Sequence, residues 1–234
     1  MVSILLKLIP LSMITSTVII LIITDAESSR DILSYNFFLQ MFSTLLVSIA
    51  MRRYNLQNVN LANYVTYLRL VIMITLLVLI LFRSDVDNMY YSLYITFFSF
   101  LVLIMDWLDG YFARKLKQIT DFGFFFDQEV DNIFLFILVL SITLNNSELY
   151  FLWLIPLLRY IFLLMKYIFV WMRSELYDSI RRKSICAVTT FLLIVCNLEF
   201  LSFFLIELLS IISISIIVFS FMKDILWLYR RNNA

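Results

Sequence analysis

The sequence predicts an all-helical, polytopic membrane protein. Hydrophobic residues make up 63% of its 234 residues and charged residues only 15%, whereas a soluble domain is about half apolar and about a quarter charged. The mean hydropathy is +0.95. The apolar residues are concentrated in long runs, which is typical of helices that cross a lipid bilayer.

Eight apolar runs predict a bundle of about eight membrane helices. The predicted helices span residues 4–24, 32–51, 65–82, 89–108, 124–144, 149–171, 185–198 and 203–229. No small-residue cleavage site follows the first run, which favours a retained helix over a signal peptide.

The distribution of charge predicts the orientation of the chain in the membrane. Arginine and lysine lie mainly in alternate loops and at the C-terminus, while the opposite loops are mainly acidic. Because cytoplasmic loops carry the excess of basic residues, an even number of spans places both termini in the cytoplasm.

One polar motif stands out from this apolar background. Both glycines of the chain lie in the stretch 106–131, which reads D-x2-D-G-x2-A-R-x8-G-x3-D-x3-D. Asp106 and Asp109 are three residues apart, and Asp127 and Asp131 are four apart, so each pair shares one helix face. If the two helix ends meet, four carboxylates converge at the cytoplasmic membrane surface.

Four converging carboxylates predict a metal site. Oxygen ligands suit Mg²⁺ or Mn²⁺, and two such ions could bridge a diphosphate. The chain has no histidine, so carboxylates must carry any acid–base or metal role. The alternative is that these aspartates pair with Arg114, Lys115 and Lys117 in a solvated loop. Such pairing would account for one or two of the aspartates, but not for two pairs that each share one face of a helix.

The motif resembles the signature of the CDP-alcohol phosphatidyltransferase family at every position, and the chain is similar to the phosphatidylglycerophosphate synthases of that family. The resemblance implies an enzyme whose shared six-helix core corresponds to residues 59–234. Residues 1–58 would be an extension of two transmembrane helices, with an open role. The resemblance also implies that the four aspartates hold two metal ions and that Asp131 deprotonates the acceptor hydroxyl.

A CDP-binding set follows from the same resemblance. It includes an N-x-x-T-x-x-R element one helix before the motif; by itself, a Thr and an Arg at a helix start are more often a cap and an interfacial anchor than ligands. The implied CDP-binding residues are Asn63, Thr66, Arg69, Asp109, Gly110, Ala113, Arg114 and Gly123.

The acceptor is predicted from cations further along the chain. Arg159 lies inside an apolar run, where a charge usually needs a partner. Arg181, Arg182 and Lys183 resemble a degenerate form of the G-K-x-K-T element of phosphatidylglycerophosphate synthases, but they could equally be a cytoplasmic anchor. Together these cations could bind the phosphate of glycerol 3-phosphate or inositol phosphate.

The predicted function is transfer of the phosphatidyl group of CDP-diacylglycerol to a small phosphorylated polyol, with release of CMP. One alternative is transfer of a CDP-activated head group to diacylglycerol, which would need an apolar acceptor groove rather than cations. Another is a transporter, which would carry charges near the bilayer midplane. The expected partners are a CDP-alcohol, a small hydroxyl acceptor, membrane lipid and a second copy of the chain, with no nucleic acid. The expected location is a bacterial inner membrane, with the active site on the cytoplasmic side.

Overall fold

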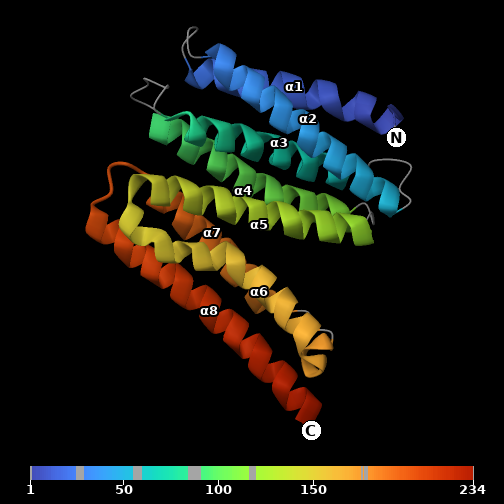
Figure 1. Cartoon of the computed structure of the whole chain (residues 1–234), viewed down its shortest axis with the longest axis vertical. Coiled ribbons are helices and arrows are strands. Elements are labelled where there is room, and N and C mark those ends of the chain that lie inside the picture. Colours follow the sequence, from blue (N-terminus) through green and yellow to red (C-terminus); the bar gives the residue numbers. More distant parts are fainter. Residues whose placement is uncertain are drawn as a thin grey trace. The chain divides into compact units, whose positions relative to one another are not determined.

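The computed structural model describes residues 2–24, 29–54, 60–83, 91–115, 120–174, 176 and 179–233, and these residues form helices only (Figure 1). The predicted all-helical class is therefore confirmed. The described helices are α1 (Val2–Ile23), α2 (Ser29–Arg53), α3 (Leu61–Leu81), α4 (Tyr91–Lys115), α5 (Asp121–Asn145), the 3₁₀ helix η2 (Ser147–Trp153), α6 (Leu154–Ile168), the 3₁₀ helix η3 (Val170–Arg173), α7 (Ile180–Cys196) and α8 (Phe203–Asn233).

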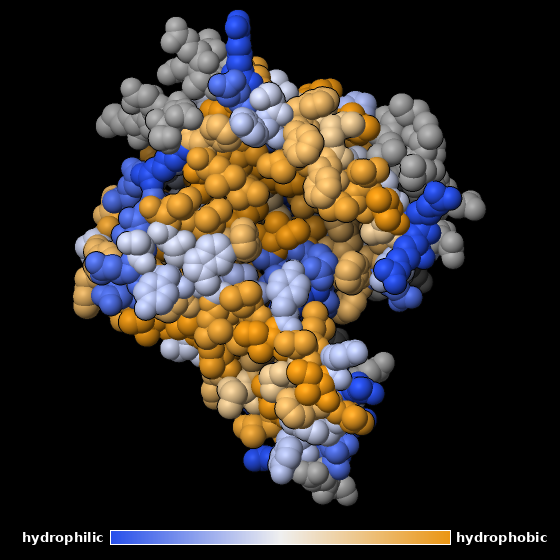
Figure 2. All heavy atoms as spheres, viewed as in Figure 1, coloured by the Kyte–Doolittle hydropathy of each residue, from blue (hydrophilic) through white to orange (hydrophobic). Residues whose placement is uncertain are grey.

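The helices have the length and composition of membrane spans. Among the described residues, five helices are long and apolar enough to cross a bilayer: Arg30–Arg53, Leu61–Leu81, Tyr91–Tyr111, Ser147–Ile168 and Phe203–Asn232. Large apolar side chains cover much of the face seen in Figure 2, and Phe38 and Phe204 are 68% and 69% exposed. Such a surface is stable only against lipid. The protein is an integral, polytopic membrane protein.

The helix that carries the first two aspartates is longer than predicted. The apolar run ends at Leu108, but α4 continues to Lys115. Hydropathy marks where the apolar residues end, whereas charged residues can continue the same helix. Asp106 and Asp109 therefore lie within α4 rather than at its end. The second pair of aspartates is carried by α5, which begins at Asp121, three residues before the predicted start.

The predicted sixth helix, residues 149–171, agrees closely with the candidate span Ser147–Ile168, but it is not a uniform α-helix and ends earlier than predicted. Its residues form η2, α6 and η3 in succession. Leu149 has non-helical dihedral angles of −90° and 23°, and α6 begins only two residues before Pro156. Proline has no N–H to donate, so it fits well in the first turn of a helix, where Pro156 lies in α6.

The chain divides into two compact units, Met1–Asp131 and Asn132–Ala234. In the first unit, α3 forms the core and packs against α1, α2 and α4. Figure 1 shows α3 between α2 and α4. In the second unit, α6 and α7 both pack on the long helix α8. All four motif aspartates belong to the first unit.

Candidate active site

The centre of the site is the guanidinium group of Arg69, on α3. Its side chain is only 1% exposed, and its Nη1 atom lies 2.9 Å from Asp106, 2.6 Å from Asp109 and 2.9 Å from Asp127. Its Nη2 atom donates a hydrogen bond to Asp131. One buried arginine therefore contacts all four carboxylates of the motif.

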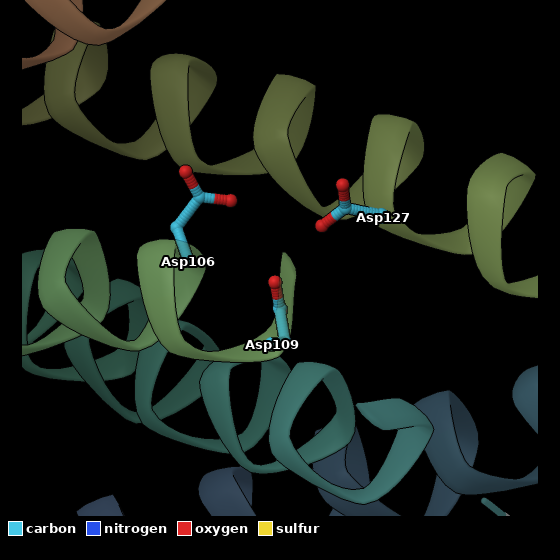
Figure 3. A group of neighbouring side chains, drawn as sticks. All are labelled: Asp106, Asp109 and Asp127. Carbon is cyan, nitrogen blue, oxygen red and sulfur yellow. The ribbon is translucent and has the colours of Figure 1, made fainter. Parts of the chain in front are cut away.

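The four aspartates come from two helices. Asp106 and Asp109 lie on α4, and Asp127 and Asp131 on α5. Figure 3 shows Asp106, Asp109 and Asp127 pointing into the space between these helices. Each of these three offers a carboxylate oxygen within 4.8 Å of the others, close enough to share a metal ion. Asp131 is not part of that group and contacts Arg69 through the other guanidinium nitrogen. The pair of aspartates on α4 and the pair on α5 therefore converge, as predicted.

The site combines a buried cation with partly open anions. The Asp109 side chain is 5% exposed, whereas those of Asp106, Asp127 and Asp131 are 36%, 39% and 35% exposed. One guanidinium cannot neutralise four carboxylates, and charges removed from water need counter-ions. The open side of the cluster is therefore available to further cations.

Among the described residues, the cation that contacts the aspartates is Arg69 and comes from α3. Sequence reasoning offered Arg114, Lys115 and Lys117 as partners. The Lys115 ammonium lies over the Tyr111 ring, 5.2 Å from its centroid. Lys117 and the side chain of Arg114 lie outside the described residues, as does the side chain of Ala113. The pairing role belongs to Arg69, which sequence reasoning had assigned to the nucleotide.

The other members of the N-x-x-T-x-x-R element share α3 with Arg69. The Thr66 hydroxyl donates to Asp109 at 3.0 Å. Asn63 is buried, and its Nδ2 donor has no hydrogen-bond partner among the described residues. Gly110 follows Asp109 on α4 and is half-buried. These residues thus share the first compact unit with the four aspartates.

Gly123 allows α5 to approach α3 closely. A Cβ atom at this position would lie 3.0 Å from Asn63 Oδ1 and 3.0 Å from Thr120 Oγ1. The Thr120 hydroxyl accepts a hydrogen bond from the Gly123 N–H, which is the usual role of an N-cap residue. The first turn of α5 is therefore fixed against Asn63 at a point where a side chain would intrude.

The cations predicted to bind the acceptor lie in the second unit. Arg181, on α7, donates to Asp224 on α8 and lies 3.2 Å from the Ser220 hydroxyl. Arg182 lies 3.8 Å from the other Asp224 oxygen. Arg159 is half-buried and Lys183 is exposed. Sequence reasoning missed Asp224, which is 4% exposed. Asp224 is one of two acids inside the apolar run of α8, and this was the available signal, because such a charge needs a partner.

The fold and the site define an integral membrane protein with a carboxylate-rich centre suited to cations. The chain belongs to the CDP-alcohol phosphatidyltransferase family, whose sequence model matches residues 59–226. The predicted family is therefore confirmed.

Three curated relatives have the same name, CDP-diacylglycerol–glycerol-3-phosphate 3-phosphatidyltransferase. The protein of Aquifex aeolicus is 42% identical over 65 residues, which cover 26% of this chain and 36% of the relative. That of Haemophilus influenzae is 50% identical over 38 residues, covering 16% and 20%. That of Pseudomonas fluorescens is 32% identical over 91 residues, covering 39% and 45%. Each match thus spans less than half of the relative's length. No solved structure matches the chain.

Proposed function

We propose that this protein transfers the phosphatidyl group of CDP-diacylglycerol to glycerol 3-phosphate or a similar phosphorylated polyol, with release of CMP. The observation that carries this proposal is the convergence of Asp106, Asp109 and Asp127 from two helices of a family member. The relatives named for that reaction support the choice of donor and acceptor.

The carboxylates fit Mg²⁺ or Mn²⁺. Both ions prefer oxygen ligands, and three carboxylates with oxygens within 4.8 Å of one another offer only oxygen. We propose that two ions are held by Asp106, Asp109, Asp127 and Asp131. When bound, they would neutralise the diphosphate and the charge that develops during transfer.

The residues of the site have separate roles in the proposed reaction. Asp131 accepts the proton of the acceptor hydroxyl, whose oxygen forms a bond to the lipid-linked phosphorus as the bond to the CMP oxygen breaks. Asn63 offers the nucleotide a buried N–H donor that no described residue accepts from. Thr66 and Arg69 orient Asp109. Gly110, Ala113, Arg114 and Gly123 complete the proposed CDP site. Positioning and charge neutralisation supply most of the expected acceleration.

The acceptor phosphate is proposed to bind the cations of the second unit. Arg181 and Arg182 both lie beside the carboxylate of Asp224, and paired guanidinium groups suit the recognition of a phosphate. Arg159 and Lys183 are the other cations proposed for this role.

The remaining proposals concern the membrane location, orientation, domain organisation and oligomeric state of the enzyme. The basic loops support a cytoplasmic site with both termini on the same side, in a bacterial inner membrane. The match from residue 59 onward supports a core of residues 59–234 preceded by an extension of residues 1–58. The substrates include membrane lipid, and the active form is proposed to be a homodimer.

The proposed reaction is tested by CMP release from the purified protein in detergent. The assay contains CDP-diacylglycerol and Mg²⁺ or Mn²⁺, with glycerol 3-phosphate, inositol phosphate, inositol and serine added separately. We expect release with glycerol 3-phosphate that EDTA abolishes. Release with serine or inositol instead would contradict the phosphorylated acceptor. The remaining outcome is that the protein releases no CMP with any of the four acceptors, but releases it with CDP-choline or CDP-ethanolamine and diacylglycerol. The lipid would then be the acceptor and the CDP-activated head group the donor.

Gly123→Ala is expected to weaken nucleotide binding more than folding. The added methyl group must displace Asn63 or Thr120, at a cost of about 1–3 kcal/mol for overpacking, while alanine recovers about 1 kcal/mol of helix propensity. The melting temperature should therefore fall by only a few degrees. The KM for CDP-diacylglycerol should rise several-fold because Asn63 is moved. An unchanged KM would contradict a role for this close approach in the nucleotide site.

A further inference from the structure

A row of polar side chains runs along α2 at four-residue spacing, on a helix that is otherwise largely apolar. Asn36, Gln40, Thr44 and Ser48 are each at most 2% exposed. Residues four apart lie on one face of a helix, so these four form a continuous buried stripe, here called the polar seam. The large side chains around it, such as Phe38, are exposed instead.

The polar seam bonds directly to α3. The Gln40 amide donates to the Val71 carbonyl at 2.9 Å and lies 3.4 Å from the Thr75 hydroxyl. The Thr44 and Tyr67 hydroxyls are 2.6 Å apart, and Tyr67 also hydrogen-bonds Ser12 of α1. Both helices of the N-terminal extension therefore reach the same side of α3.

The opposite side of α3 carries the site. With 100° per residue, Tyr67, Val71 and Thr75 point on average about 140° away from Thr66. Thr66 and Arg69 contact Asp109. One face of α3 is thus hydrogen-bonded to the extension, and the other is bonded to the carboxylate cluster.

Hydrogen bonds within a membrane fix the rotation and register of a helix. Helices in lipid associate mainly through van der Waals packing, and such packing tolerates small rotations. A side-chain bond to a particular carbonyl or hydroxyl is lost when the helix turns. Within the described part of the chain, the amide oxygens of Asn36 and Gln40 are buried without a hydrogen-bond partner, which is costly in an apolar environment. The polar seam is therefore poorly suited to a helix that only anchors the chain in the membrane. It is well suited to setting the rotation and register of α3.

We infer that the N-terminal extension is part of the catalytic apparatus: Gln40, Thr44 and Tyr67 are positioning residues that hold α3 so that Thr66 and Arg69 meet the carboxylates. The expected change in kcat rests on the proposed function. The structural claim, that these residues fix the position of α3, does not. It assigns a role to the two helices that precede the family match.

The kinetic test uses Thr44→Val, which removes the hydroxyl and keeps the shape. Displacements of about 1 Å in an active site can cost about 100-fold in rate, so we expect kcat for CMP release to fall at least tenfold with a smaller change in KM. Thr44→Ser keeps the hydroxyl and should restore most of the rate. Ser34→Ala is the matched control, because Ser34 is exposed on α2 and bonds only within its own helix. Wild-type kcat in Thr44→Val would overturn the inference.

A double-mutant cycle tests the structural part without any substrate. Thr44→Val, Thr66→Val and the combined variant are compared by thermal unfolding in detergent. Distant, independent sites give additive shifts, whereas a shared dependence on the position of α3 should make the combined shift clearly smaller than the sum. Additive shifts would overturn the inference. If Thr44→Val does not fold, Tyr67→Phe removes the other hydroxyl of the same bond and takes its place. A wild-type protein that released no CMP would refute the proposed function, while the cycle would still decide the inference.

Discussion

Asp131→Asn is expected to lower kcat for CMP release by about 10²–10⁴-fold, the usual contribution of a general base. Asparagine has nearly the same shape as aspartate, but it cannot take the proton of the acceptor hydroxyl. Its amide can also no longer pair with the Arg69 guanidinium as an anion. The measurement is CMP release with CDP-diacylglycerol, glycerol 3-phosphate and Mg²⁺.

Asp121→Asn is the matched control for this variant. Asp121 lies on the same helix and is exposed in its first turn, so its loss should change kcat less than threefold. Both proteins should elute alike on size exclusion, which separates a chemical defect from misfolding. If Asp131→Asn retained more than a tenth of the wild-type rate, another group would have to be the base.

Arg69→Gln is expected to produce the largest loss of stability. Removing one partner of a buried ion pair typically costs about 3–5 kcal/mol, and Arg69 has four partners. Three of these carboxylates are about one-third exposed, so water screens part of their repulsion and the lower end, about 3 kcal/mol, is expected. For a chain of this length that corresponds to a melting temperature lower by about 6–12 °C. The measurement is thermal unfolding in detergent with EDTA.

Divalent ions should recover part of the stability lost in Arg69→Gln. Because the variant leaves four carboxylates without their cation, millimolar Mg²⁺ or Mn²⁺ should raise its melting temperature more than that of the wild type. Arg30→Gln, at an exposed position near the start of α2, should behave like the wild type throughout. Equal shifts with metal in both proteins would contradict the idea that ions and guanidinium serve the same carboxylates.

The class of fold and the carboxylate cluster were predictable because their signals are local. Apolar runs identify helices that must satisfy their own backbone in lipid, and three- and four-residue spacings fix which aspartates share a face. The ends of the helices were less predictable. Hydropathy could not show that α4 continues to Lys115 or that a 3₁₀ helix precedes α6.

Which charged residues pair with one another could not be predicted from the sequence. Arg69 is 37 residues before Asp106 and 62 before Asp131 in the chain, and nothing local shows that its guanidinium enters the cluster. The same holds for Asp224 and Arg181, which come from different helices. The spacing of Gln40 and Thr44 is visible in the sequence, but only the packing of α2 on α3 gives that spacing a meaning.

The single guanidinium among four carboxylates has a consequence for the order of binding. With all four aspartates ionised, four negative charges and one positive charge would leave the cluster at three net negative charges, so a diphosphate approaching the bare site would be repelled. Two divalent ions would reverse the sign to one net positive charge, and the same diphosphate would then be attracted. The metals would thus act as obligatory first ligands, and chelation would abolish nucleotide affinity itself rather than turnover alone.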